Sequence, residues 1–153
     1  MNFGRYQDAK WMKGDFFLAD DPLLDRKVMI QFAPEGSFEW TRRLASAGGP
    51  LIQRLLDVGL APDGRNYIIR EVVEGRTLED IGPDPGLLDP LRAALAQLHQ
   101  HGLQHRDLQP SNIVLTPEGV VRLTNMRYQG REDQEALEEL EAWFASGRHW
   151  TDR

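Results

Sequence analysis

Residues 105–112, which read His-Arg-Asp-Leu-Gln-Pro-Ser-Asn, hold the side chains whose types and spacing could do chemistry. Asp107 and Asn112 lie five residues apart, on either side of a proline. A carboxylate gives a hard dication the anionic oxygen that it needs, and a loop of this composition could serve phosphoryl transfer. Both residue types also bond well to turn backbone. The pair could therefore do chemistry or only brace the loop.

The elements around this loop must position its two polar side chains. Apolar runs bounded by turn residues predict strands at residues 16–19, 27–32, 51–58 and 66–73. Helical spacing and stop signals predict helices at residues 37–47, 89–102 and 132–146, and a short hairpin is predicted at residues 113–115 and 120–123. The middle helix has the strongest pattern, with Asp89 as its cap and Gly102 at its end. The loop thus lies between a helix and a hairpin.

Composition narrows the class of protein. The chain has 153 residues, 41% of them hydrophobic, a net charge of -6 and no cysteine, which together predict one globular domain in a reducing compartment. No apolar run approaches the roughly 20 residues that cross a bilayer, and the start lacks a signal peptide. We therefore expect a cytoplasmic protein without a membrane partner. The acidic balance argues against a nucleic-acid partner. No metal pattern surrounds the four histidines, His99, His101, His105 and His149.

The order of these motifs resembles a protein kinase of the bacterial, eukaryotic-like serine/threonine type. Val-Met-Ile-Gln, residues 28–31, stands where the family has V-A-I-K, the loop at residues 105–112 resembles the catalytic loop, and Asn-Met-Arg, residues 125–127, stands where D-F-G would lie. The likeness covers about residues 5–127. It implies an α+β, protein kinase-like fold, with a β-rich N-lobe of about five antiparallel strands and one helix. A mainly helical C-lobe with a short β-hairpin should follow.

The resemblance also implies an internal division of the single domain, residues 1–153. It assigns the N-lobe to residues 1–73, the hinge to 74–80, the C-lobe with its catalytic-loop-like segment to 81–127, and an acidic helix and tail to 128–153. A full kinase continues far beyond D-F-G, whereas 26 residues follow Arg127 here (153 minus 127). The resemblance therefore predicts a truncated C-lobe without an activation segment.

Several charges that the family uses are missing. In a kinase, the loop aspartate accepts the proton of the substrate hydroxyl and the loop asparagine holds a metal, and Asp107 and Asn112 match these two positions. The third-strand lysine, however, corresponds to Gln31, the metal-binding aspartate of D-F-G to Asn125, and the loop lysine to Gln109. Neutral amides replace one hard anion and two cations. Asp107 and Asn112 are therefore predicted to be vestigial.

The nucleotide pocket is predicted to be occluded. Trp11 stands where the second glycine of the glycine-rich loop belongs, and of its glycines only Gly14 remains. Met29 replaces the small alanine of V-A-I-K, and Arg70 replaces the gatekeeper before the hinge. A buried arginine needs a carboxylate or carbonyl partner. The predicted pocket residues are Trp11, Gly14, Met29, Gln31, Arg70, Glu71 and Val73.

These losses predict a catalytically inactive pseudokinase, which is not an enzyme, takes no cofactor and acts as a regulatory, protein-binding module. The alternative is a small atypical kinase that uses ATP with Mg. In it, Lys13 would replace the missing lysine, while Asp107 and Asn112 keep their family roles. Glu39 is the nearest candidate for the helix-C glutamate, although it does not align with that position.

The predicted C-terminal helix suggests where a partner would bind. Without the further helices of a full kinase, its apolar face should stay partly uncovered, which is unusual for a monomer, and aromatic side chains are common hot spots. We therefore expect a homodimer or a protein partner bound through Leu137, Leu140, Trp143, Phe144 and Trp150. The acidic side chains of this helix predict a solvated face or, alternatively, a docking surface for a basic partner; they are Glu132, Asp133, Glu135, Glu138, Glu139 and Glu141.

Overall fold

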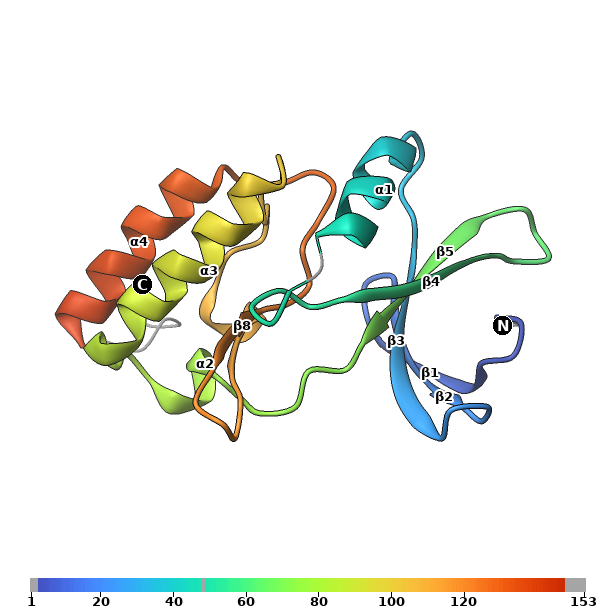
Figure 1. The fold of residues 1–153 in the computed structure, drawn as a ribbon, viewed down its shortest axis with the longest axis horizontal. Coiled ribbons are helices and arrows are strands. Elements are labelled where there is room, and N and C mark those ends of the chain that lie inside the picture. Colours follow the sequence, from blue (N-terminus) through green and yellow to red (C-terminus); the bar gives the residue numbers. More distant parts are fainter. Residues whose placement is uncertain (1–2, 48, 148–153) are drawn as a thin grey trace. The chain divides into compact units, whose positions relative to one another are not determined.

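The chain folds as two compact units (Figure 1). The computed structural model describes residues 3–47 and 49–147. Unit 1 consists of Met1–Gly48 and Arg54–Val72, and unit 2 of Gly49–Gln53 and Val73–Arg153. The short segment Gly49–Gln53 therefore belongs with the second unit, although the sequence places it next to a strand of the first.

Unit 1 is built on a five-stranded antiparallel sheet. Its strands are β1 (Gln7–Lys13), β2 (Phe16–Asp21), β3 (Arg26–Phe32), β4 (Leu55–Leu60) and β5 (Asn66–Glu71), in the order β1-β2-β3-β5-β4. One helix, α1 (Phe38–Ser46), follows β3. Strand β1 covers the residues predicted as the glycine-rich loop, and the predicted strand at residues 51–58 begins only at Leu55. The remaining strands and α1 match their predicted ranges within two residues.

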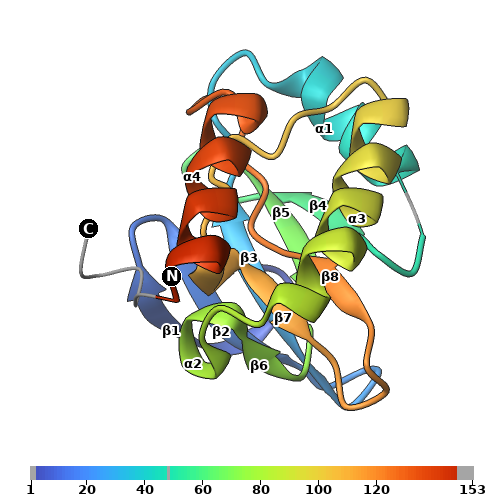
Figure 2. The same ribbon diagram turned by 90° about the vertical axis from the view of Figure 1, so that its left-hand side faces the viewer.

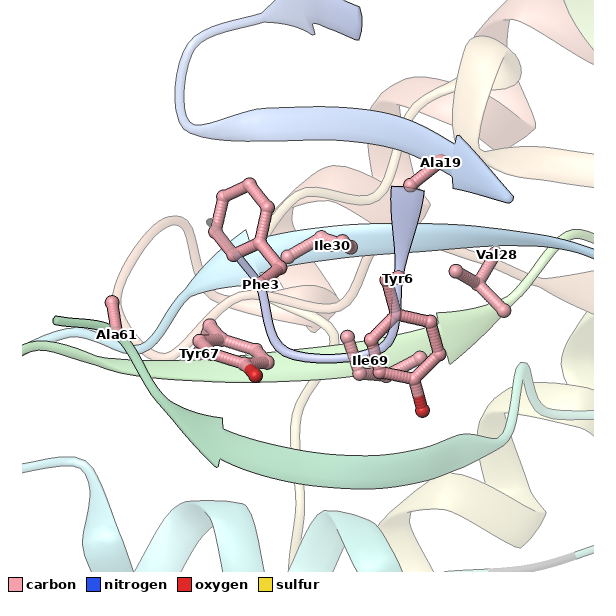
Figure 3. Close-up of a cluster of buried hydrophobic side chains, with 8 residues drawn as sticks. All are labelled: Phe3, Tyr6, Ala19, Val28, Ile30, Ala61, Tyr67 and Ile69. Carbon is pink, nitrogen blue, oxygen red and sulfur yellow. The ribbon is translucent and has the colours of Figure 1, made fainter. Parts of the chain in front are cut away.

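One face of the sheet carries the main apolar core of unit 1. Alternate residues of β3 and β5 point to this face, as the period of two in a strand requires. The chain before β1 forms a hook that contributes Phe3 and Tyr6 to the core. Figure 3 shows the buried cluster, which consists of Phe3, Tyr6, Ala19, Val28, Ile30, Ala61, Tyr67 and Ile69. The carboxylate of Asp21 accepts hydrogen bonds from Arg5 of the hook and from Arg26. These hydrogen bonds, that of Arg5 first, lower the pKa of the Asp21 carboxyl below its usual value.

Unit 2 contains two long helices that lie side by side (Figures 1 and 2). They are α3 (Leu88–Gln100) and α4 (Asp133–Ser146). They run antiparallel, because Arg92 near the start of α3 pairs with Glu141 near the end of α4, while His99 near the end of α3 contacts Asp133 at the start of α4. Helix α4 ends at Gly147, whose φ of 69° is the left-handed conformation that favours glycine.

A small three-stranded sheet lies beside α3. Its strands are β6 (Arg76–Thr77), β7 (Ile113–Leu115) and β8 (Val121–Leu123), in the order β6-β7-β8, and β7 and β8 form the predicted hairpin. The segment Gly49–Gln53 joins this sheet, because Ile52 forms a parallel bridge with Leu123. A short helix, α2 (Leu78–Ile81), and two 3₁₀ turns, Pro85–Leu87 and Pro110–Asn112, complete the unit. The predicted α+β architecture is confirmed.

Helix α4 buries the side chains that we expect at an interface. Trp143 is 1% exposed, Leu140 and Phe144 are also buried, and Leu137 is half-buried. The premise of an open apolar face is therefore wrong for Leu140, Trp143 and Phe144, and an interface at Leu137 stays a prediction. Trp150 lies outside the described residues.

In the part of the chain that the structure describes, no helix is both long enough and apolar enough to span a membrane.

Candidate functional site

The carboxylate of Asp107 is held in a fixed orientation by two amide side chains of unit 2. Gln109 Nε2 donates to Asp107 Oδ1 at 2.8 Å, and Asn112 Nδ2 donates to Oδ2 at 3.0 Å. Arg127 Nη1 lies 3.8 Å from Oδ2, and the side chain of Asp107 is 30% exposed. The carboxylate is therefore oriented by neighbours and still reachable from solvent.

Asn112 joins this carboxylate to the residue at the D-F-G position. It is 1% exposed, and its Nδ2 also donates to the backbone oxygen of Asp107 at 2.8 Å. Its Oδ1 accepts from Asn125 Nδ2 at 3.0 Å. Asp107 and Asn112 of the loop and Asn125, which follows β8, thus form one hydrogen-bonded row. Carboxylate and amide oxygens gather in this row.

His105 fixes the backbone at the start of the loop, and its hydrogen bonds define its tautomer. Its Nε2 lies 2.6 Å from the backbone oxygen of Thr124, which can only accept, so Nε2 carries the proton. Its Nδ1 accepts from the backbone N–H of Asp107 at 3.1 Å. The fully buried ring is therefore the neutral Nε2–H form. The hydrogen bond of Nε2 joins the loop to Thr124, the residue that follows β8.

Asp133, the first residue of α4, anchors the same loop from the other side. Its Oδ2 accepts from the backbone N–H of His105 at 2.8 Å and from His99 Nε2 at 2.8 Å, and its Oδ1 accepts from the backbone N–H of Arg106 at 3.0 Å. The side chain is buried. The sequence predicts Asp133 on a solvated face or a docking surface and does not indicate this buried role. An acid in the first helical turn is the one signal that it offers.

The segment between β8 and α4 runs closely along the loop. Arg131 N donates to the oxygen of Arg106 at 3.1 Å, and a Cβ on Gly130 would lie 2.0 Å from that oxygen, so only glycine fits there. Arg106 has a φ of 70°, a strained value for this residue. Its guanidinium donates to Glu132 at 3.0 Å. Hydrogen bonds from Gln104 and then Arg106 lower the pKa of Glu132 below its usual value.

In unit 1, the residues at the strand-lysine and gatekeeper positions contact each other. Arg70 Nη2 donates to Gln31 Oε1 at 2.5 Å, across two adjacent strands. Both side chains are buried. Trp40 of α1 lies 5.9 Å from the guanidinium, whereas Glu39, the candidate for the helix-C glutamate, faces Arg42 on the exposed side of the helix. On the side of Arg70 that faces α1, the indole of Trp40 thus takes the place of the helix-C carboxylate of a kinase.

The other predicted pocket residues of unit 1 differ in their surroundings. Trp11 is 65% exposed and donates its indole N–H to the oxygen of Gly14 at 2.8 Å, so its ring closes a turn and does not fill a buried space. Gly14 has a φ of 51°, which explains a glycine at this turn. Met29 is half-buried and lies opposite Arg70 in the sheet.

The residues predicted after the gatekeeper lie at the end of β5. Glu71 is the last residue of this strand, and its Oε1 accepts from the backbone N–H of Arg54 at 2.8 Å. Val73 is half-buried and is the first residue of the second segment of unit 2. The predicted pocket residues are therefore distributed over both units, and their role as a nucleotide site stays a prediction.

A five-stranded antiparallel sheet with one helix, followed by a helical unit with an Asp–Asn catalytic-type loop, defines a protein kinase-like chain. No family model matches it. Curated relatives do: the chain is 32% identical over 143 residues to a probable serine/threonine-protein kinase of Clostridium perfringens, covering 88% of this chain and 20% of the relative. It is also 32% identical over 145 residues to the serine/threonine-protein kinase PrkC of Bacillus subtilis, covering 80% of this chain and 22% of that protein.

A third relative, a probable serine/threonine-protein kinase PknB of Corynebacterium glutamicum, is 32% identical over 131 residues, with 71% of this chain and 20% of the relative covered. The chain belongs to the protein kinase-like family. It spans about a fifth of the length of these curated relatives.

The comparisons overturn two predictions made from the missing charges. The neutral residues Gln31 and Asn125 predict a chain that is not an enzyme and takes no cofactor. Both predictions are wrong, because the relatives carry the names of serine/threonine-protein kinases, and protein kinases work on ATP with Mg. Loss of a charge at an aligned position does not exclude the chemistry when other residues can supply it.

Proposed function

We propose that this chain carries the nucleotide-binding and phosphoryl-transfer elements of a protein kinase-type phosphotransferase that uses ATP with Mg. The observation that carries the proposal is the row Asp107–Asn112–Asn125, held on a loop that His105 and Asp133 anchor. A loop that only braced the fold would not need a carboxylate that is both oriented by two amides and partly exposed. The relatives support the same reaction class.

Asp107 is the proposed base. Its carboxylate takes the proton of a substrate hydroxyl, while Gln109 and Asn112 hold it in one orientation. Arg127 Nη1 lies 3.8 Å from Asp107 Oδ2, so a cation faces the carboxylate from its other side. In unit 1, Lys13 ends β1 opposite Phe16 and is the proposed mobile cation for the phosphates, because an exposed ammonium on a flexible stem acts as a point charge.

The oxygen donors of unit 2 fit a magnesium ion that arrives with the nucleotide. Among residues 3–47 and 49–147, no three acidic or histidine side chains form a metal cluster. Mg²⁺ in such sites keeps several waters and binds the substrate phosphates, and the amide oxygens of Asn112 and Asn125 could add two protein donors beside Asp107, the proposed base. When bound, the ion would neutralise charge on the phosphates. We expect the protein's own share of its binding to be small, because neither amide donor is anionic.

Asn125→Asp tests this donor set. The new carboxylate would face Asn112 Oδ1, which now accepts from the Asn125 amide, and Asp tolerates the left-handed φ of 60° at this position. We expect affinity for ATP to rise about 10-fold with Mg and to stay unchanged or fall with EDTA. Calorimetric titration measures both. Asn66→Asp, the same change on an exposed residue of β5, is the control. An equal effect of the two substitutions would contradict the proposal.

A regulatory, protein-binding role is a second candidate. It is favoured by exposed apolar side chains of unit 1, where Phe38 is 72% and Val58 55% exposed and both line a pocket of about 730 Å³. If a second copy binds there, light scattering should detect a dimer of the wild type that Phe38→Ser weakens. A strict monomer at all concentrations would remove this candidate.

A further inference from the structure

The side chain of Arg70 places a buried positive charge beside the position where the family has a lysine. Arg70 lies on β5, 39 residues after Gln31 on β3, yet its Nη2 reaches Gln31 Oε1 at 2.5 Å. The guanidinium is also 5.9 Å from the rings of Phe16 and Trp40, within the range of a cation–π interaction. With 1% of its surface exposed, the cation is fixed in place.

This contact fixes the orientation of the Gln31 amide, in a residue that is 3% exposed. A guanidinium only donates hydrogen bonds, so the amide oxygen must face Arg70 and the NH₂ group must face away from it. A charged donor on the oxygen also polarises the amide and makes its N–H groups stronger donors. Gln31 thereby presents two N–H donors that are backed by a full positive charge.

The same row of the sheet carries a second cation. Gln31 lies opposite Phe16 on β2, and Phe16 lies opposite Lys13 on β1. The register of β1 with β2 is irregular between Trp11 and Lys13, so this pairing places Lys13 in the same row of the sheet without assigning its side chain to a face. Neighbouring strands are about 4.8 Å apart, so Lys13 starts two strands away from Gln31, within reach of a long side chain. Lys13, Gln31 and Arg70 thus come from strands that are close together in the sheet of unit 1.

We infer that Gln31 and Arg70 together form a phosphate-recognition unit for the nucleoside triphosphate, in place of the single strand lysine. Gln31 donates to a phosphate oxygen, and Arg70 is the positioning residue that orients and polarises it. The inference rests on the proposed function and names its phosphate contact. It differs from the expectation that Arg70 blocks the nucleotide, because here the arginine supplies the charge that position 31 lacks.

Gln31→Glu is the sharpest test. The change keeps the shape of the side chain and gives Arg70 a buried ion-pair partner, so the fold should be retained. It also replaces the NH₂ group of Gln31 by a carboxylate oxygen, which repels phosphate. Titration calorimetry with ATP and with adenosine, both with Mg present, should show at least about a 10-fold loss for ATP and less than about a 3-fold change for adenosine. Asn66→Asp, an equal change of charge on an exposed residue, should leave both affinities unchanged.

A charge exchange between the two positions completes the test. Arg70→Met should reduce the preference for ATP over adenosine, and the double variant Gln31→Lys with Arg70→Met should restore it to within about 3-fold of the wild type. Gln31→Lys alone should lower the thermal stability, since two cations would meet in one buried place. Melting curves of all variants separate unfolding from loss of affinity.

The outcomes of these titrations distinguish failure of the inference from failure of the proposed function. Unchanged ATP affinity of Gln31→Glu in a chain whose wild type binds ATP would overturn the inference and leave the proposed function intact. Equal losses for ATP and adenosine would also overturn it, because a purely structural pair affects both ligands alike. If the wild type binds neither ligand, the inference and the proposed function both fail.

Discussion

Asp107→Asn should lower the rate of phosphoryl transfer by about 10²–10⁴-fold, the usual contribution of a positioned general base. The asparagine oxygen can still accept one of the two amide hydrogen bonds that now hold the carboxylate. It cannot take a proton from a hydroxyl at neutral pH. We therefore expect kcat to fall while the KM for ATP stays within about 3-fold of the wild type. A steady-state assay of transfer from ATP measures both constants.

Asp89→Asn is the matched control. Asp89 is in the first turn of α3, its side chain is 93% exposed, and its contact with Arg92 is a surface ion pair, which contributes little. Its kcat should equal that of the wild type. An Asp107→Asn variant that keeps more than about a tenth of the wild-type kcat would show that another group acts as the base.

Asp133→Ala should destabilise the protein by about 3–5 kcal/mol, the cost of breaking a buried charged network. The substitution leaves the backbone N–H groups of His105 and Arg106 without their acceptor, in a region where Asp133 is 2% exposed. It also removes the contact with His99 that joins α3 to α4. Urea denaturation, followed by the tryptophan fluorescence of α4, measures the loss.

Glu135→Ala provides the comparison for Asp133→Ala. Glu135 is an exposed acid two residues further along the same helix, so its loss should change the free energy of unfolding by less than about 0.5 kcal/mol. If Asp133→Ala lowers the free energy of unfolding by no more than Glu135→Ala does, Asp133 does not hold the loop. Asp133→Asn should lie between the two, because the amide keeps one acceptor oxygen.

The regular elements of this chain are predictable because their signals are local. Spacing of apolar residues indicates α3 and α4 within two residues, and the alternation in β2, β3 and β5 indicates the sheet. The order of motifs around Asp107 and Asn112 indicates the kinase-like fold. Strand β1 is missed because its residues are mostly exposed and its pairing with β2 is irregular, so it has no periodic pattern.

The contacts that complete the candidate site are not local, and the sequence does not indicate them. Asp133 meets His105 from 28 residues away, and Arg70 meets Gln31 from 39 residues away. In the sequence, Asp133 has the pattern of an ordinary acidic residue on a helix, and Arg70 that of an ordinary arginine on a strand. The sequence does not indicate the burial of Trp143 for the same reason, because this burial depends on how helix α4 packs against residues far away in the chain.

Calorimetric titration of the wild-type chain with ATP, in Mg and in EDTA, tests the central claim most directly. The account predicts saturable binding in Mg with a Kd of about 1 mM or tighter, the range in which the KM values of enzymes fall, and weaker binding in EDTA. Adenosine in place of ATP should bind more weakly, because the phosphates supply the contacts with Lys13 and Gln31. Absence of saturable ATP binding in Mg, in a chain that melts cooperatively, would contradict the account.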